Sequence, residues 1–203
     1  MKRVPWLTLG IVLVAAIFVV SCASYKAVPI PKLQPEFAIN AQKQNDVLVA
    51  VHVFTVDDCR RYFDYDIIGG GYQPIQIAVD NQSKEILLLS KDGISQPSVP
   101  PEEVAHKCHR STVGRATAYG VGALFLWPLA IPAVVDGVKS SNANTRMDTD
   151  FAAKGFQDTV IQPFNNISGI IFVPTTECRP DLTINLINRE TRDKISFTFN
   201  NIK

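Results

Sequence analysis

Thiols are the side chains with the most chemistry to offer in this 203-residue chain. Cys22 follows Ser21 at the end of an apolar run, and three further cysteines lie in the rest of the chain: Cys59, Cys108 and Cys178. A thiol can be acylated, can pair in a disulfide or, as thiolate, can bind a metal ion. No serine, cysteine or carboxylate lies in a recognisable nucleophile motif. We therefore expect no enzyme activity and no cofactor.

The three later cysteines are candidates for one disulfide. If consecutive strands alternate in direction, the loops that carry them fall at one pole of the fold. In an oxidising compartment two of them would pair, and Cys59–Cys178 is our preferred pair. His106 and His109 flank Cys108, but residues two apart do not share a helix face. We therefore favour a disulfide over a metal site and expect no bound metal.

The N-terminus has the form of a secretory signal peptide. Lys2 and Arg3 give a positive start, and the apolar run from Leu7 to Val20 is interrupted only by Thr8 and Gly10. A run of about 7–15 apolar residues, followed by small residues at the cut, is typical of such a peptide. An uncleaved membrane anchor with a chance cysteine is the alternative.

The sequence Val19-Val20-Ser21-Cys22 resembles the lipobox of bacterial lipoproteins. The resemblance implies cleavage before Cys22, transfer of a diacylglycerol to its thiol, and a lipid anchor of several acyl chains such as palmitate, which suffices for stable attachment. In that family Asp after the cysteine favours the inner membrane. Here Ala23 follows, which implies the outer membrane, facing a periplasm. The prolines that come next indicate a stiff, extended segment rather than a continuing helix: Pro29, Pro31 and Pro35.

The charge of the mature chain is close to neutral. Removing Lys2 and Arg3 from the 20 basic residues leaves 18, against 19 acidic residues. A nucleic-acid partner calls for a basic face that neutralises phosphates, so we expect none. The expected partners are a membrane, through the lipid on Cys22, and a protein of the cell envelope.

Short apolar runs between turn signals predict a mainly β fold, an antiparallel β-sandwich of immunoglobulin-like type. Val47–Phe54 has the composition of a buried strand, and we expect 57–71 to be a long connection after it. The strongest hairpin prediction joins 182–186 to 195–199, because apolar and polar residues alternate in both runs. The expected domains are a signal peptide at 1–21, a lipidated, proline-containing tether at 22–46, and a sandwich at 47–203 with a helical insertion at 100–155. Fully extended, that tether would reach up to ~75 Å.

The insertion is apolar in its middle, where Thr117–Val135 carries no charged side chain. Its length approaches the ~20 residues of a membrane-spanning helix, but Pro128 and Pro132 interrupt it, so we expect a hairpin of two helices, at 112–126 and 128–140. Small residues four apart would let these helices pack closely: Gly114, Ala118 and Gly122 on the first, Ala133 and Gly137 on the second. The tip would be apolar: Phe125, Leu126, Trp127, Pro128 and Leu129.

A further helix is expected at 144–154, in the last part of the insertion. Asp150 precedes Lys154 by one turn on this helix, and Gly155 would end it.

Three interpretations of the insertion remain open. It covers a face of the sandwich as part of the core, it packs against a partner protein, or its tip enters a bilayer with Trp127 at the interface. We interpret the chain as a non-catalytic, lipid-anchored interaction or scaffold module of the envelope. The alternative is a carrier or sensor of a lipid or other apolar small molecule, gated by the hairpin.

The substitution Cys22→Ala is expected to abolish acylation and cleavage at this position, because the thiol is the acceptor. Mass spectrometry of the N-terminal peptide from membranes is the measurement. A lipidated mutant, or a wild-type protein that keeps Met1, would contradict the prediction.

Overall fold

Residues 25–109 and 130–202 are described by the computed structural model. The chain divides into two units, each considered by itself. The larger unit, Lys26–Cys108 with Asp148–Lys203, contains all the strands described. The smaller unit is Met1–Tyr25 with His109–Met147.

The first sheet has the strand order β1-β2-β3-β6 and is antiparallel throughout. Its strands are β1 (Gln42–Gln44), β2 (Val47–Val53), β3 (Tyr72–Asn81) and β6 (Asn165–Pro174). β3 and β6 pair over their whole length, from Tyr72 opposite Pro174 to Asn81 opposite Asn165. β1 falls inside the segment expected as a tether, so the end of that segment forms part of the sheet.

The second sheet has the order β5-β4-β7-β8 and is also antiparallel. Its strands are β4 (Leu87–Leu89), β5 (Thr159–Ile161), β7 (Leu182–Asn188) and β8 (Lys194–Phe199). The hairpin predicted from the alternating residues is confirmed, with Leu182 opposite Phe199 and Leu186 opposite Ile195. The mainly β prediction, as two four-stranded antiparallel sheets, is therefore confirmed.

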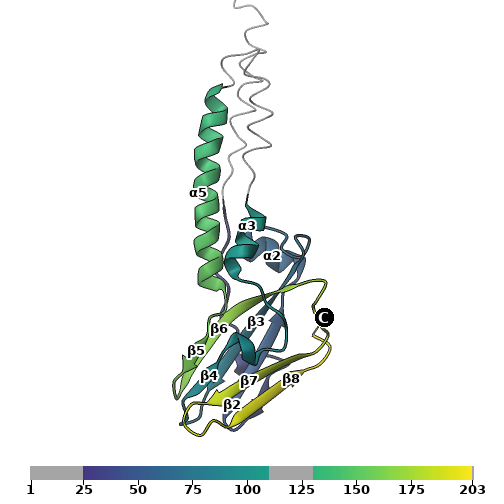
Figure 1. Ribbon diagram of the computed structural model, residues 1–203, viewed down its shortest axis with the longest axis vertical. Helices are drawn as coiled ribbons and strands as arrows, with labels where there is room; N and C mark the ends of the chain where they lie inside the picture. Colours follow the sequence, from purple (N-terminus) through teal and green to yellow (C-terminus); the bar gives the residue numbers. More distant parts are fainter. Residues whose placement is uncertain (1–24, 110–129, 203) are drawn as a thin grey trace, which may run out of the picture. The chain divides into compact units, whose positions relative to one another are not determined.

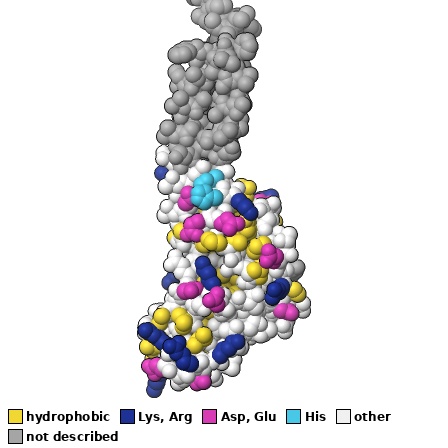
Figure 2. Space-filling model, in the orientation of Figure 1, with side chains coloured by type: hydrophobic (Ala, Val, Ile, Leu, Met, Phe, Trp, Pro, Cys, Tyr) yellow, Lys and Arg dark blue, Asp and Glu magenta, His cyan; other side chains and the backbone are white. Residues whose placement is uncertain are grey.

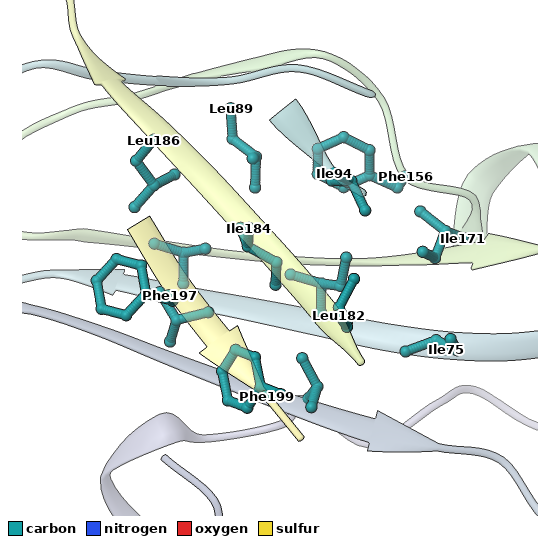
Figure 3. Close-up of a cluster of buried hydrophobic side chains, with 14 of the residues drawn as sticks. Ile75, Leu89, Ile94, Phe156, Ile171, Leu182, Ile184, Leu186, Phe197 and Phe199 are labelled. Carbon is teal, nitrogen blue, oxygen red and sulfur yellow. The ribbon is translucent and has the colours of Figure 1, made fainter. Parts of the chain in front are cut away.

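The two sheets enclose one hydrophobic core. In the strands other than β1, alternate residues point inward, as Figure 3 shows for Ile75 and Ile171 of the first sheet and Ile184 and Phe197 of the second. These side chains are at most 2% exposed. Their burial removes apolar surface from water, which favours folding of the larger unit.

The helices gather at one end of the larger unit, which we call the helical pole (Figure 1). It carries α2 (Val56–Phe63), α3 (Pro101–Cys108) and the last residues of α5 (Ala130–Lys154). Two short 3₁₀ turns, η1 (Pro35–Phe37) and η2 (Lys91–Gly93), complete the elements. Among the residues described, no helix is both long and apolar enough to span a membrane.

The connection expected at 57–71 is partly helical, which corrects the sequence-based prediction. α2 begins with a reciprocal cap: the Asp58 amide donates to Thr55 Oγ1, and the Thr55 amide donates to Asp58 Oδ2. Burial opposes ionisation of Asp58, but the hydrogen bonds from Thr55 and His52 outweigh it and lower its pKa. The cap satisfies amides that a short helix otherwise leaves unpaired.

The insertion between β4 and β5 differs from its prediction in its second half. α5 is one continuous helix of 25 residues, where two segments, 128–140 and 144–154, were expected. Pro132 fits because it lies in the first turn, where a helix needs no amide donor. Ala133 and Gly137 fall within α5. The other predicted features lie outside the residues described: the signal peptide with Cys22, the tip at 125–129, and Gly114, Ala118 and Gly122.

The alternation in β8 leads to a stability prediction. Phe197→Ala removes a ring that is 1% exposed and is expected to lower the free energy of unfolding by about 3–5 kcal/mol. Lys194→Ala, on an exposed position of the same strand, is the matched control and should change it by less than about 0.5 kcal/mol. Denaturant titration followed by circular dichroism gives both values. Equal effects would contradict the register of β8.

Candidate functional site

Both ends of the insertion attach to the free edge of β6. On the way in, the amide of Val99 donates to the carbonyl of Phe172 at 2.9 Å. On the way out, the amide of Phe156 donates to the carbonyl of Ile170 at 2.7 Å. The two acceptors are two residues apart on one strand. The insertion therefore leaves and rejoins the sandwich at one place.

The two ends also contact each other at a glycine. A Cβ atom on Gly155 would lie 2.2 Å from Cγ of Pro101, closer than atoms can approach. Glycine is required here by the close packing of the chains. It also follows Lys154, the last residue of α5, as expected for a helix stop. Phe156 then packs over Gly169 of β6 and enters the core between the sheets.

An aromatic cluster fixes the helical pole to the outer face of the first sheet. Phe63 of α2 lies 4.7 Å from Phe151 of α5 and 5.7 Å from Phe172 of β6, between ring centroids. Phe151 stacks on Phe172 at 5.6 Å, and Phe54, at the end of β2, lies 6.1 Å from Phe63. Such pairs add about 0.5–1.5 kcal/mol each beyond area burial. The cluster joins α2 and α5 to the sheet.

α3 is held by a polar contact beside its buried face. The Tyr72 hydroxyl, at the start of β3, donates to Glu103 Oε1 at 3.0 Å, and Lys107 Nζ donates to the same hydroxyl. Val104 and Ala105 of the same helix are fully buried. α3 and the last residues of α5, which form the two ends of the insertion, are thus both fixed within the larger unit.

The predicted disulfide is absent, because Cys59, Cys108 and Cys178 are all free thiols. Cys178 packs at the edge of the core between the sheets, whereas Cys59 lies on α2, outside that core. Burial raises the pKa of Cys59 to about 12, opposed by hydrogen bonds from the Ile67 and Ile68 amides. Burial, reinforced by nearby Cys59, raises the pKa of Cys108 to about 12. These two thiols are therefore structural rather than reactive.

Residues 26–38, which we call the strap, run along the outer face of the first sheet. The Lys26 amide donates to Asp64 Oδ2 at 3.0 Å, beside α2. Gln76 Nε2, in the middle of β3, donates to the Pro31 carbonyl at 3.1 Å. Gln82 Nε2, just past the other end of β3, donates to Glu36 Oε1 at 3.1 Å. The strap therefore spans the whole length of β3.

Lys154 connects the strap to the helices. Its Nζ donates to the carbonyls of Val28 and Tyr62 and to Asp150 Oδ2. The side chain is only 10% exposed, and burial lowers its pKa although Asp150 opposes this. An ammonium group has three hydrogens to donate, so every one of them has an acceptor. Sequence spacing predicted the Asp150–Lys154 pair on one helix face, but no local pattern indicated the two carbonyls.

A cavity of about 540 Å³ lies between the strap and β6. Its walls are Ala27 and residues 29–33 of the strap, residues 166–170 of β6, Gln76 of β3, and Asp150, Ala153 and Lys154 of α5. The lining mixes apolar side chains with these hydrogen-bonded polar groups. In the part of the chain that the structure describes, no three His, Cys, Asp or Glu side chains come together as a metal site would require.

Comparisons with protein-family models, with curated proteins and with solved structures found no match to this chain.

The burial of the thiols leads to a labelling prediction. At pH 8 a thiol with a pKa of about 12 is about one part in 10⁴ thiolate, so Cys59 and Cys108 should react with a maleimide far more slowly than free cysteine. Mass spectrometry should find label on the partly exposed Cys178 first, and on all three after denaturation. Fewer than three reactive thiols in the denatured, unreduced protein would reveal a disulfide and contradict the structure.

Proposed function

We propose that this protein is a lipid-anchored, non-catalytic interaction or scaffold module of the outer membrane, with the apolar insertion as its working surface. The observation that carries the proposal is the double attachment of the insertion to β6, through Val99 and Phe156. A segment that only filled a gap in the core would not need both of its ends fixed side by side. A sandwich that holds both ends in one place is suited to present what lies between them.

The coverage of the first sheet supports a partner or membrane role over a core role. Its outer face already carries the strap, through Gln76, and the aromatic cluster, through Phe172. Gln76 and Phe172 are 5% and 0% exposed. The outward residues of β7 and β8 are mostly polar, such as Thr183 and Ser196, and tolerate water. An additional apolar cover is therefore not required by the first sheet or by β7 and β8.

The immunoglobulin-like topology is part of the proposal, and the strand order supports it. In that fold strands A, B and E are neighbours in one sheet, and C, F and G in the other. The strand order β2-β3-β6 in the first sheet corresponds to A, B and E, and the order β4-β7-β8 in the second sheet corresponds to C, F and G. β5, paired with β4, takes the place of strand C′. The insertion would then lie between strands C and C′, and its proposed helical hairpin would extend from that connection.

A carrier of an apolar small molecule or lipid is the second candidate. The cavity beneath the strap favours it, because about 540 Å³ lies in the range of small-molecule sites. Native mass spectrometry of protein extracted from membranes in mild detergent separates the candidates. A bound lipid besides the anchor supports the carrier, and a stoichiometric protein subunit supports the scaffold.

Two charged substitutions at the predicted tip test the working surface. Leu126→Asp with Trp127→Asp should leave the sandwich folded and abolish recovery of the co-purifying subunit. Leu126→Met, which keeps the tip apolar, is the control and should retain it. If the tip were core, the buried charges would cost several kcal/mol and unfold the domain.

Circular dichroism and a thermal melt detect that unfolding. If the double mutant stays folded and still co-purifies with the subunit, the insertion is not the working surface.

A further inference from the structure

We propose that the strap holds the larger unit close to the lipid bilayer, with the helical pole toward the membrane and the β7–β8 turn away from it. This inference rests on the lipid anchor proposed at Cys22. It names the surface of the protein that meets the membrane, which the anchor alone leaves open.

The short connection between lipid and strap carries the first step. Only Ala23, Ser24 and Tyr25 separate Cys22 from Lys26, whose amide is bonded to Asp64. Four Cα–Cα steps of 3.8 Å span at most about 15 Å. A free tether of the length expected from the sequence would have reached ~75 Å. Because the strap is docked, the lipid on Cys22 can lie only about 15 Å from Lys26.

The place where the strap begins gives the orientation. Asp64 is the residue that ends α2, and the Val28 amide donates to the carbonyl of Arg61 in the last turn of that helix. Lys154 binds the Val28 carbonyl as well. These contacts lie at the helical pole, so the lipid must leave from that end of the larger unit.

The opposite end is a full strand length away. Asn81 ends β3 there, and its side-chain amide donates to the carbonyl of Glu85. Glu85 in turn accepts a hydrogen bond from Asn188, at the start of the β7–β8 turn. β3 has ten residues, which at about 3.4 Å each separate the two ends by about 30 Å.

We do not expect the exposed charged side chains at the helical pole to set a different orientation. Two exposed cations at the helical pole lie close to carboxylates: Arg60 is 3.8 Å from Asp57, and Lys107 is 3.8 Å from Glu103. Figure 2 shows positive and negative side chains interspersed over the larger unit on the face in view. On this face an anionic membrane would therefore meet charges of both signs, so we attribute the orientation to the lipid and its short connection.

Energy transfer in vesicles tests the orientation. The full, acylated protein with Cys178→Ser is reconstituted in phosphatidylcholine vesicles that contain a headgroup-labelled acceptor lipid. A donor dye is placed at Asp57→Cys in α2, where the side chain is 96% exposed, or at Glu190→Cys in the β7–β8 turn. We expect several-fold higher transfer from position 57 than from position 190. Equal transfer from the two positions would overturn the proposal.

A linker variant provides the matched control. Twenty Gly/Ser residues inserted between Ser24 and Tyr25 leave the strap contacts intact but add a flexible chain of about 25 Å root-mean-square length. The difference between the two dye positions should then largely disappear. If it persists unchanged, the short connection does not set the orientation and the proposal fails.

Mass spectrometry of the N-terminal peptide, done on every sample, keeps this inference separate from the proposed function. An unacylated Cys22 refutes the lipid anchor itself, and with it this inference. An acylated protein with equal transfer from both positions refutes the orientation alone.

Discussion

The helical pole depends on one buried ammonium group, that of Lys154. Its three hydrogens bind Asp150 of the same helix, the Tyr62 carbonyl of α2 and the Val28 carbonyl of the strap. A charge taken out of water is tolerated only when its hydrogen-bonding capacity is used. Losing any acceptor would leave a buried donor unsatisfied, so the three segments are coupled. The strap, whose side chains are largely exposed, contributes little apolar area and relies on such polar contacts.

β6 provides the surface that makes this arrangement possible, because it is buried on both faces. Ile171 and Val173 point into the core between the sheets, while Ile170 and Phe172 point outward to the strap and the aromatic cluster. A strand covered on both sides has a continuous apolar sequence rather than an alternating one. Its free edge then accepts the two ends of the insertion. One strand thus serves the core, the helical pole and the insertion.

The sequence predicted those strands and helix ends that depend on the residues within the segment itself. The alternation in β7 and β8, the apolar run of β2 and the helix stop at Gly155 follow from side-chain periodicity and backbone preference, and the structure agrees with them. The extended conformation of the strap also follows from its prolines. Its docking does not, since the acceptor at Pro31 is a backbone carbonyl, and any residue would offer the same atom to Gln76.

Other features were missed for identifiable reasons. α2 is short and polar, so its apolar period is weak, although Thr55 and Asp58 have the spacing of a helix cap. The disulfide was inferred from the compartment and from strand parity. Strand parity predicts which loops lie at the same pole, but it does not predict whether a cysteine in such a loop packs against the core between the sheets. Cys178 does pack against that core, whereas Cys59 lies outside it.

The contact between Gly155 and Pro101 has a consequence for how the protein can change over evolutionary time. The two ends of the insertion contact each other, so the insertion is a loop that is closed at its base. The entropic cost of closing such a loop grows only slowly with the number of residues in it. Residues can be gained or lost beyond this junction without altering the register of any strand. We therefore expect homologues to vary in the length and composition of the insertion while they keep a glycine and a compact partner at its base. Selection for a new binding partner could then act on one segment while the sandwich stays unchanged.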